Sequence, residues 1–264
     1  MSLNRRSLLK AGFATMIGMR TAQSQSSGGS GGVKALVFDT FGTVVDWRGS
    51  IMAEGTVWGK SKGIDIDWAR FADRWRAGYA PSMDKVRKGE MPWTKLDVLH
   101  RMILDDLLKE FGITGLTEEE KDHWNRVWHR LKPWPDSVPG LARLKKKFTI
   151  APLSNGNVSL LADMAKNAGI PWDLILSAEL ARHYKPDREA YLTAVELLTL
   201  KPEEVMMTAA HRNDLEAARS FGLRTGFIHR PDEYGPSRRG DTAKAEDFDV
   251  VSENMIELAA KMGV

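Results

Sequence analysis

Short apolar runs alternate with helical patterns throughout residues 33–228, and this alternation limits the possible folds more than any other feature of the chain. Five runs have the length and composition of buried strands. They are Val33–Phe38, Phe148–Leu153, Leu174–Leu176, Val205–Met207 and Thr225–Ile228. Helical patterns separate the later runs, namely Asn157–Ala168, Asp187–Leu198 with Pro186 in its first turn, and Asn213–Phe221. This order predicts an α/β fold in which a doubly wound parallel sheet carries helices on both faces.

One long segment, residues 47–134, interrupts the alternation and contains no run that predicts a strand. Its amphipathic patterns predict four helices. They are Ile51–Lys62, Trp68–Met83, Leu96–Phe111 and Thr117–Leu131, the last opening with a capping box. We therefore expect a helical domain, residues 47–134, inserted into an α/β core formed by residues 33–46 and 135–264. Six of its tryptophans are expected mostly to pack in the interior, with one or two free to line a pocket. They are Trp58, Trp68, Trp75, Trp93, Trp124 and Trp128.

The first 32 residues differ from the rest in composition. Asn4-Arg5-Arg6 precedes a short apolar run, Ala11–Met19, and a Ser/Gly-rich stretch follows at Ser24–Gly32. This order is typical of a twin-arginine export signal and linker, and a disordered tail is the alternative. We expect a periplasmic or secreted protein with no membrane segment after cleavage. The pattern marks no cleavage site clearly.

Charge and cysteine content exclude several functions. The chain has a net charge of +3, and residues 1–32 supply four basic charges and no acidic one, so the remainder carries −1. No basic stripe with interleaved aromatic residues stands out, which argues against a nucleic-acid partner. The chain has no cysteine, so disulfides, thiolate metal sites and a cysteine nucleophile are excluded.

Polar side chains follow the predicted strands at their carboxyl ends, where open α/β sheets bind ligands. Asp39 follows the first strand, and the next three strands are followed in turn by Ser154-Asn155, Lys185 and Asp214. An aspartate can act as a nucleophile, and a nearby lysine keeps it ionised. Serine, asparagine and backbone N–H groups can hold an anionic substrate, and a second acid can orient the lysine or activate water.

Each of these residues also has an ordinary structural interpretation. Asp39 could cap a helix, Lys185 could be a solvated loop residue, and Ser154-Asn155-Gly156 could be a plain turn. Tyr191 and His211 could be buried structural side chains. The alternatives stay open at this point.

The four segments, in order, resemble the four motifs of the haloacid dehalogenase superfamily. They are Asp39-Thr40-Phe41-Gly42-Thr43, Ser154-Asn155-Gly156, Lys185-Pro186-Asp187 and the segment ending at Asp214. The helical insertion resembles the superfamily's cap domain. The resemblance covers residues 33–264 and implies a Rossmann-like core.

Two positions separate the reactions known in this superfamily. Its phosphatases carry an acid two residues after the nucleophile and an acidic pair in the fourth motif that holds Mg²⁺. Phe41 and Ala210 occupy the matching places here. Because Mg²⁺ needs hard oxygen ligands, the sequence resembles the type II L-2-haloacid dehalogenases more than the phosphatases. That resemblance implies no metal or other cofactor.

The dehalogenase resemblance implies a reaction and a set of roles. Asp39 would attack C2 of a small anionic 2-halocarboxylate with inversion, and water would then hydrolyse the ester to release a 2-hydroxy acid. Lys185 would keep Asp39 anionic and, with Ser154, position the substrate carboxylate. Thr43 would hydrogen-bond around the nucleophile, and Asp214 would help to activate water.

The resemblance also implies a halide- and substrate-binding set. It contains Phe41, Arg76, Asn155 and Tyr191, and Arg70 and Arg74 compete with Arg76 for the halide. His211 stands where better-known members carry asparagine, so it could position water or assist as a base. Relatives are commonly dimers, but no interface pattern is visible in the sequence. A phosphatase with a rearranged metal site and a non-catalytic anion-binding protein remain the alternative functions.

Overall fold

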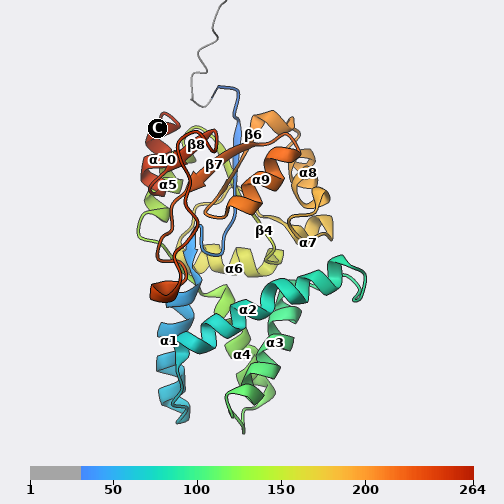
Figure 1. Ribbon diagram of the computed structural model, residues 1–264, viewed down its shortest axis with the longest axis vertical. Coiled ribbons are helices and arrows are strands. Elements are labelled where there is room, and N and C mark those ends of the chain that lie inside the picture. Colours follow the sequence, from blue (N-terminus) through green and yellow to red (C-terminus); the bar gives the residue numbers. More distant parts are fainter. Residues whose placement is uncertain (1–30) are drawn as a thin grey trace, which may run out of the picture.

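The computed structural model describes residues 31–264 and contains a six-stranded parallel sheet in the order β5-β4-β1-β6-β7-β8 (Figure 1). The strands are β1 (Ala35–Phe38), β4 (Thr149–Ser154), β5 (Leu176–Ser177), β6 (Val205–Ala209), β7 (Arg224–Ile228) and β8 (Val250–Ser252). The predicted α/β class with a parallel sheet is confirmed. β8 was not predicted, because three residues at a sheet edge leave little pattern in the sequence.

Helices cover both faces of the sheet. One face is covered by α5 (Ser137–Leu144), α6 (Val158–Ala168) and α10 (Met255–Lys261), and the other by α8 (Arg188–Leu197) and α9 (Arg212–Ser220). A short helix α7 (Ala178–Ala181) and the 3-10 turns η2 (Pro202–Glu204) and η3 (Gly235–Ser237) lie in the connections. Side chains of β1 alternate between two apolar cores, with Leu36 and Phe38 in one and Val37 in the other.

β1 lies at the centre of the sheet, paired in parallel with β4 and β6. Leu36 is opposite Ile150 on one side and Met206 on the other. All of β1 is buried, which explains its unbroken apolar sequence. The carboxyl ends of these strands therefore meet at one edge of the sheet.

The cap follows β2 (Val45–Asp46) and consists of four helices and a 3-10 turn. These are α1 (Trp47–Lys62), α2 (Trp68–Arg87), α3 (Leu96–Glu110), α4 (Glu118–Asn125) and η1 (Arg126–His129). In Figure 1 the cap lies below the carboxyl edge of the sheet. The chain returns to the core through β3 (Lys132–Pro133), which pairs antiparallel with β2.

Three details of the prediction were wrong. Residues 47–134 contain the strand β3, which has two residues and is defined by its pairing with β2 rather than by any local pattern. The helix expected over Thr117–Leu131 ends at Asn125 and continues as a 3-10 turn, although its capping box is present. Helix α8 begins at Arg188, so Pro186 precedes its N-cap residue and lies outside its first turn.

The cap has a tryptophan-rich interior. Trp124 is fully buried, stacks on Trp58 with ring centroids 4.9 Å apart, and meets the edge of Trp68 at 5.4 Å. Trp75 and Trp128 are also fully buried. Most of these residues therefore pack in the interior, as predicted.

Replacing Trp124 with alanine is expected to destabilise the protein by about 3–5 kcal/mol, because it removes a large buried ring and leaves a cavity. Urea unfolding would measure the loss. Trp93→Ala is the control, since Trp93 is only partly buried and should cost less. An equal cost for both variants would contradict the assignment of Trp124 to the centre of the cap.

The predicted export signal lies outside the described residues and stays a prediction. Within residues 31–264, no helix combines the length and apolar character needed to cross a membrane.

Candidate active site

Asp39 follows β1 directly and begins a tight turn at the carboxyl edge of the sheet. Its N–H still donates to the Thr208 carbonyl of β6 at 2.9 Å, so the neighbouring strand fixes its backbone. Val44 and Val45 both donate backbone N–H groups to the Thr40 carbonyl and close the turn. Asp39 is 8% exposed and lines a cleft. Its carboxylate is therefore shielded from most of the solvent but can still be reached by a ligand.

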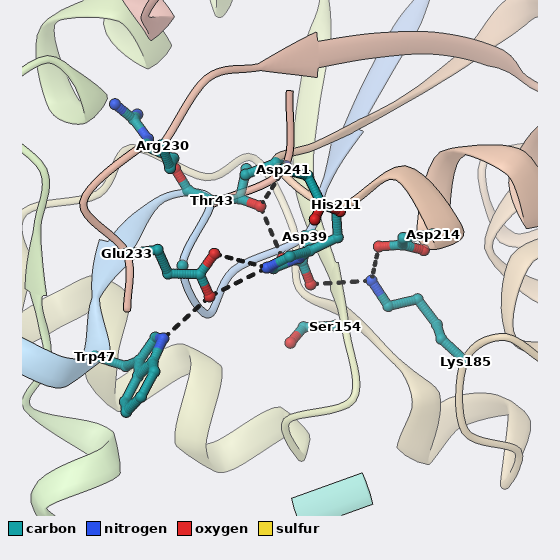
Figure 2. A network of polar contacts seen from close by, with 12 residues as sticks. Asp39, Thr43, Trp47, Ser154, Lys185, His211, Asp214, Arg230, Glu233 and Asp241 are labelled. Atoms are coloured by element: carbon teal, nitrogen blue, oxygen red, sulfur yellow. Dashed lines mark hydrogen bonds and ion pairs between the residues drawn. The ribbon is translucent and has the colours of Figure 1, made fainter. Parts of the chain in front are cut away.

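Three side chains contact the Asp39 carboxylate (Figure 2). Lys185 Nζ lies 3.1 Å from Oδ1. On Oδ2, the Thr43 hydroxyl donates at 2.8 Å and His211 Nδ1 lies 3.2 Å away. The Ala210 N–H donates to the Thr43 oxygen at 2.9 Å, which directs the Thr43 proton toward Asp39. The structure thus places three of the predicted site residues on one carboxylate.

The balance of charges keeps Asp39 ionised. Burial raises the pKa of Asp39, but the Lys185 ammonium and His211 outweigh burial and hold that pKa well below its usual range. Burial lowers the pKa of Lys185, but the Asp214 and Asp39 carboxylates raise it above the ordinary lysine value. A buried ammonium and a buried carboxylate therefore coexist at neutral pH.

Asp214 completes the charge cluster from the first turn of α9. One of its oxygens accepts a hydrogen bond from Lys185 Nζ, and the other accepts from the Tyr191 hydroxyl at 2.6 Å. Burial raises the pKa of Asp214, against the opposing effect of Lys185. The structure therefore brings Lys185, Tyr191 and Asp214 together, and it leaves Asp214 a stronger base than an exposed aspartate.

The second motif supports the lysine through Asn155. The Asn155 Oδ1 atom accepts the backbone N–H of Lys185 at 2.7 Å. Ser154 is fully buried, and its hydroxyl accepts the Gly156 N–H at 3.3 Å. Asn155 lines the cleft, whereas Ser154 lies outside its lining.

The cap contributes Arg76 from α2. Its guanidinium lies 4.2 Å above the ring of Tyr79 and lines the cleft. Its Nη1 atom is buried and has no hydrogen-bond partner among residues 31–264. Arg74 and Arg70 are instead exposed and pair with Glu110, so Arg76 is the member of the three that faces the cleft.

Phe41 turns its ring into the interior of the cap. It is 2% exposed and meets Trp128 and Tyr79 edge-on, at centroid distances of 5.7 and 6.3 Å. Its side chain lies outside the lining of the cleft.

The cleft between cap and core has a volume of about 1050 Å³ and gathers most of the predicted side chains. Those that line it are Asp39, Arg76, Asn155, Lys185, Tyr191, His211 and Asp214. The site therefore combines a buried, ionised carboxylate, cations around it and a basic carboxylate, an arrangement that suits displacement at carbon followed by hydrolysis of an ester.

Sequence reasoning missed two residues beside His211. Glu233, on the connection between β7 and β8, lies with its oxygens 2.9 and 3.1 Å from His211 Nε2. Trp47 at the start of α1 donates its indole N–H to the same carboxylate at 3.1 Å. No local sequence pattern predicts a role for either residue. The one available signal is the glycine at position 42, because glycine readily adopts the φ of +88° found in this turn.

Within residues 31–264, no group of three or more histidine, aspartate or glutamate side chains is arranged to hold a metal ion.

The fold and this charge cluster define a hydrolase of the haloacid dehalogenase class, and comparison with known proteins agrees. The family model for haloacid dehalogenase-like hydrolases matches residues 33–222, so the chain belongs to that family. Among solved structures, a defluorinating L-2-haloacid dehalogenase is 50% identical with a TM-score of 0.85, over 88% of this chain and 96% of that one. Another L-2-haloacid dehalogenase is 45% identical with a TM-score of 0.84, over 88% and 99%.

A curated relative supports the same relationship at lower identity. (S)-2-haloacid dehalogenase 1 of Pseudomonas sp. (strain CBS-3) is 29% identical over 224 residues, which is 76% of this chain and 88% of the relative.

Proposed function

We propose that the protein hydrolyses short 2-haloalkanoic acids to 2-hydroxy acids through an ester on Asp39, without a metal ion. The observation that carries this proposal is the presence of two charged groups in one cleft. They are the ionised Asp39 carboxylate and the Arg76 guanidinium, whose Nη1 lacks a partner among the described residues. A buried donor without a partner is costly, and an anion in the cleft would satisfy it. The names of the similar proteins support the same reaction.

In the first step, an oxygen of Asp39 forms a bond to C2 of the substrate, and the carbon–halogen bond breaks. The halide leaves with the bonding electron pair. Arg76 on the cap side would hold that anion, and Lys185 would keep Asp39 ionised before attack. Chloride and bromide need no proton to leave, which fits a site with Phe41 where phosphatases carry an acid.

In the second step, water attacks the carbonyl carbon of the ester. Asp214 is suited to take the proton from that water, because burial raises its pKa and Tyr191 and Lys185 orient its oxygens. The Asp39 carboxylate is regenerated and the 2-hydroxy acid leaves. Asn155 would assist by fixing the Lys185 backbone and by facing the departing halide.

The test is halide release by residues 33–264 from L-2-chloropropionate, chloroacetate and fluoroacetate in the presence of EDTA. We expect release from at least one of them, at a rate that chelation does not change. Release of phosphate from phosphate esters that requires Mg²⁺, without halide release, would instead support a phosphatase. Binding of the haloacids without turnover would support an anion-binding protein.

A further inference from the structure

His211 lies between two carboxylates, and it contacts each through a different ring nitrogen. Nδ1 is 3.2 Å from Asp39 Oδ2, and Nε2 is 2.9 Å from Glu233 Oε2 (Figure 2). A neutral imidazole has one N–H and can donate to one of them, whereas an imidazolium donates to both. Two ionised carboxylates in these positions therefore select the charged ring.

The electrostatics of the site agree with this protonation state. Burial lowers the pKa of His211, but the hydrogen bonds and charges of Asp39 and Glu233 raise it to about 10. The Glu233 side chain is 1% exposed, and the Trp47 indole N–H also donates to it at 3.1 Å. In the resting site, His211 is therefore charged at neutral pH and held from both sides.

The two oxygens of Asp39 have different surroundings. Oδ2 meets two groups, the Thr43 hydroxyl and His211 Nδ1, and these occupy both of its lone pairs. Oδ1 meets Lys185 alone among the described side chains, so it keeps a lone pair for attack on the substrate. Oδ1 thus becomes the ester oxygen bonded to C2, and Oδ2 becomes the carbonyl oxygen of the ester.

With this assignment, Thr43 and His211 also act in the second step of the reaction. When water adds to the ester carbonyl, negative charge develops on Oδ2, and the same two donors already point at that atom. Preorganised donors aimed at developing charge are among the largest contributors to catalysis. Ester formation also removes the Asp39 charge, so Glu233 is then the carboxylate that still holds His211 from its other side.

We propose that Thr43 and His211 form an oxyanion hole on Asp39 Oδ2, and that Glu233 is a positioning residue that keeps His211 charged once Asp39 is esterified. This inference rests on the proposed dehalogenation and concerns its second step. It assigns Glu233 a role that no strand-end motif predicts.

The atoms balance without any further reactant. The water oxygen bonds to the Asp39 carbonyl carbon, its proton passes to Asp214, and the carbonyl electron pair moves onto Oδ2. Collapse breaks the bond from that carbon to Oδ1, and the departing alkoxide takes a proton from Lys185 Nζ. Asp214 returns its proton to Lys185. The water oxygen stays on Asp39, which releases a proton to solvent as it ionises again.

The turn after β1 is built to admit Glu233. Gly42 has φ +88°, and a Cβ atom there would lie 2.2 Å from Glu233 Oε1. Arg230 fastens the Glu233 segment to the same turn, because its side chain donates to the Thr43 carbonyl at 2.9 Å and to both Asp136 oxygens. The glycine of the first motif therefore makes room for the carboxylate that pairs with His211.

The test is Glu233→Gln, which keeps the shape of the side chain and an acceptor for Trp47 but removes the charge. Asp39 still holds His211 in the resting variant, so we expect one equivalent of chloride to be released rapidly from L-2-chloropropionate. Steady turnover should then fall by about 10²–10³-fold, the usual effect of losing one oxyanion donor. Intact-protein mass spectrometry should detect the ester accumulating on Asp39.

The pH dependence of ester hydrolysis is a readout that a merely structural role would not move. The ionisable groups around His211 are Asp39 and Glu233, with Lys185 and Asp214 beyond Asp39. Because the charged ring is required, hydrolysis in the parent protein should slow as the pH rises through the pKa of His211. In Glu233→Gln the same loss should begin at lower pH.

The control is Glu253→Gln. Glu253 is 75% exposed and lies 3.8 Å from His229, so it is a surface version of the same pair and should leave turnover and ester level unchanged. Ester hydrolysis at the parent rate in Glu233→Gln would overturn the inference. Hydrolysis that rises as the pH passes through the pKa of His211 would also overturn it, because it would make neutral His211 a general base.

A second variant keeps the test decisive if Glu233→Gln does not fold. His211→Ala removes a donor from Oδ2, so it too should accumulate the ester, and parent-like turnover would overturn the inference. Absence of halide release by the parent protein would instead contradict the proposed dehalogenation itself, so the two failures are distinguishable.

Discussion

Halide release from L-2-chloropropionate is expected to fall at least about 10⁴-fold when Asp39 is replaced by asparagine. The amide is nearly isosteric with the carboxylate but is a poor nucleophile, so the first covalent bond does not form. The first burst of halide should disappear together with steady turnover, and no ester should be found by mass spectrometry. This outcome differs from that of Glu233→Gln, in which the burst remains.

The matched control is Asp232→Asn, at an aspartate whose side chain is 79% exposed. Halide release by the control should equal that of the parent protein. Halide release by folded Asp39→Asn at a rate near that of the parent would rule out Asp39 as the nucleophile. It would leave direct attack by water as the simplest remaining route.

Replacement of Lys185 by methionine is expected to remove activity and to destabilise the fold by about 3–5 kcal/mol near neutral pH, as when one partner of a buried ion pair is deleted. The methionine fits a similar volume but leaves Asp39 and Asp214 facing each other without the ammonium between them. Their pKa values in the folded variant should then lie above those of the unfolded chain.

The sign of the pH dependence follows from that shift. Carboxyl groups with raised pKa values favour the folded state most at low pH, and this contribution is lost as the pH rises through the folded-state values. The cost of Lys185→Met should therefore be larger at pH 7.5 than at pH 5, as measured by urea unfolding of variant and parent. Lys166→Met, at an exposed lysine, should change stability by less than about 0.5 kcal/mol. A pH-independent cost would contradict the buried charge cluster.

Most of the fold could be predicted because its central strands are buried on both faces. Such strands appear as mainly apolar runs, and β1, β4, β6 and β7 all follow this rule. β2 and β3 have two residues each, and the edge strand β8 has three. Pairing with a neighbouring strand defines these elements more than their composition does. A sequence pattern needs more residues than these strands have.

The core-side part of the site was predictable for a related reason. Asp39 follows β1 directly, and Lys185 and Asp214 lie in the segments that follow β5 and β6, so position along the chain implies position in space. Arg76 could not be separated from Arg70 and Arg74, because the three share one helix and only packing decides which faces the cleft.

The place of Glu233 in the site could not be predicted from the sequence. It lies in the long connection between β7 and β8, far in sequence from Asp39 and Gly42. Its contacts with His211 and Trp47 depend on how that connection folds over the first turn of the site. A single glutamate without periodic neighbours carries no sign of this.

The antiparallel pair β2–β3 joins the two places where the chain passes between cap and core. The two connections between cap and core are thus held side by side. Across the seam, Arg87 pairs with Asp187 and Lys95 with Glu179 at part-exposed positions, and such pairs are worth about 0–1 kcal/mol each.

Apolar contacts also join cap and core, because Phe41 packs against Trp128 and Tyr79 of the cap. If the cap rotated about β2 and β3 after the first step of the proposed reaction, a halide held by Arg76 would move with it, while the ester stays on Asp39. Separation of the two products of the first step would then prevent the halide from attacking the ester and re-forming the substrate. A single rotation of the cap would therefore release the halide and prevent the first step from reversing.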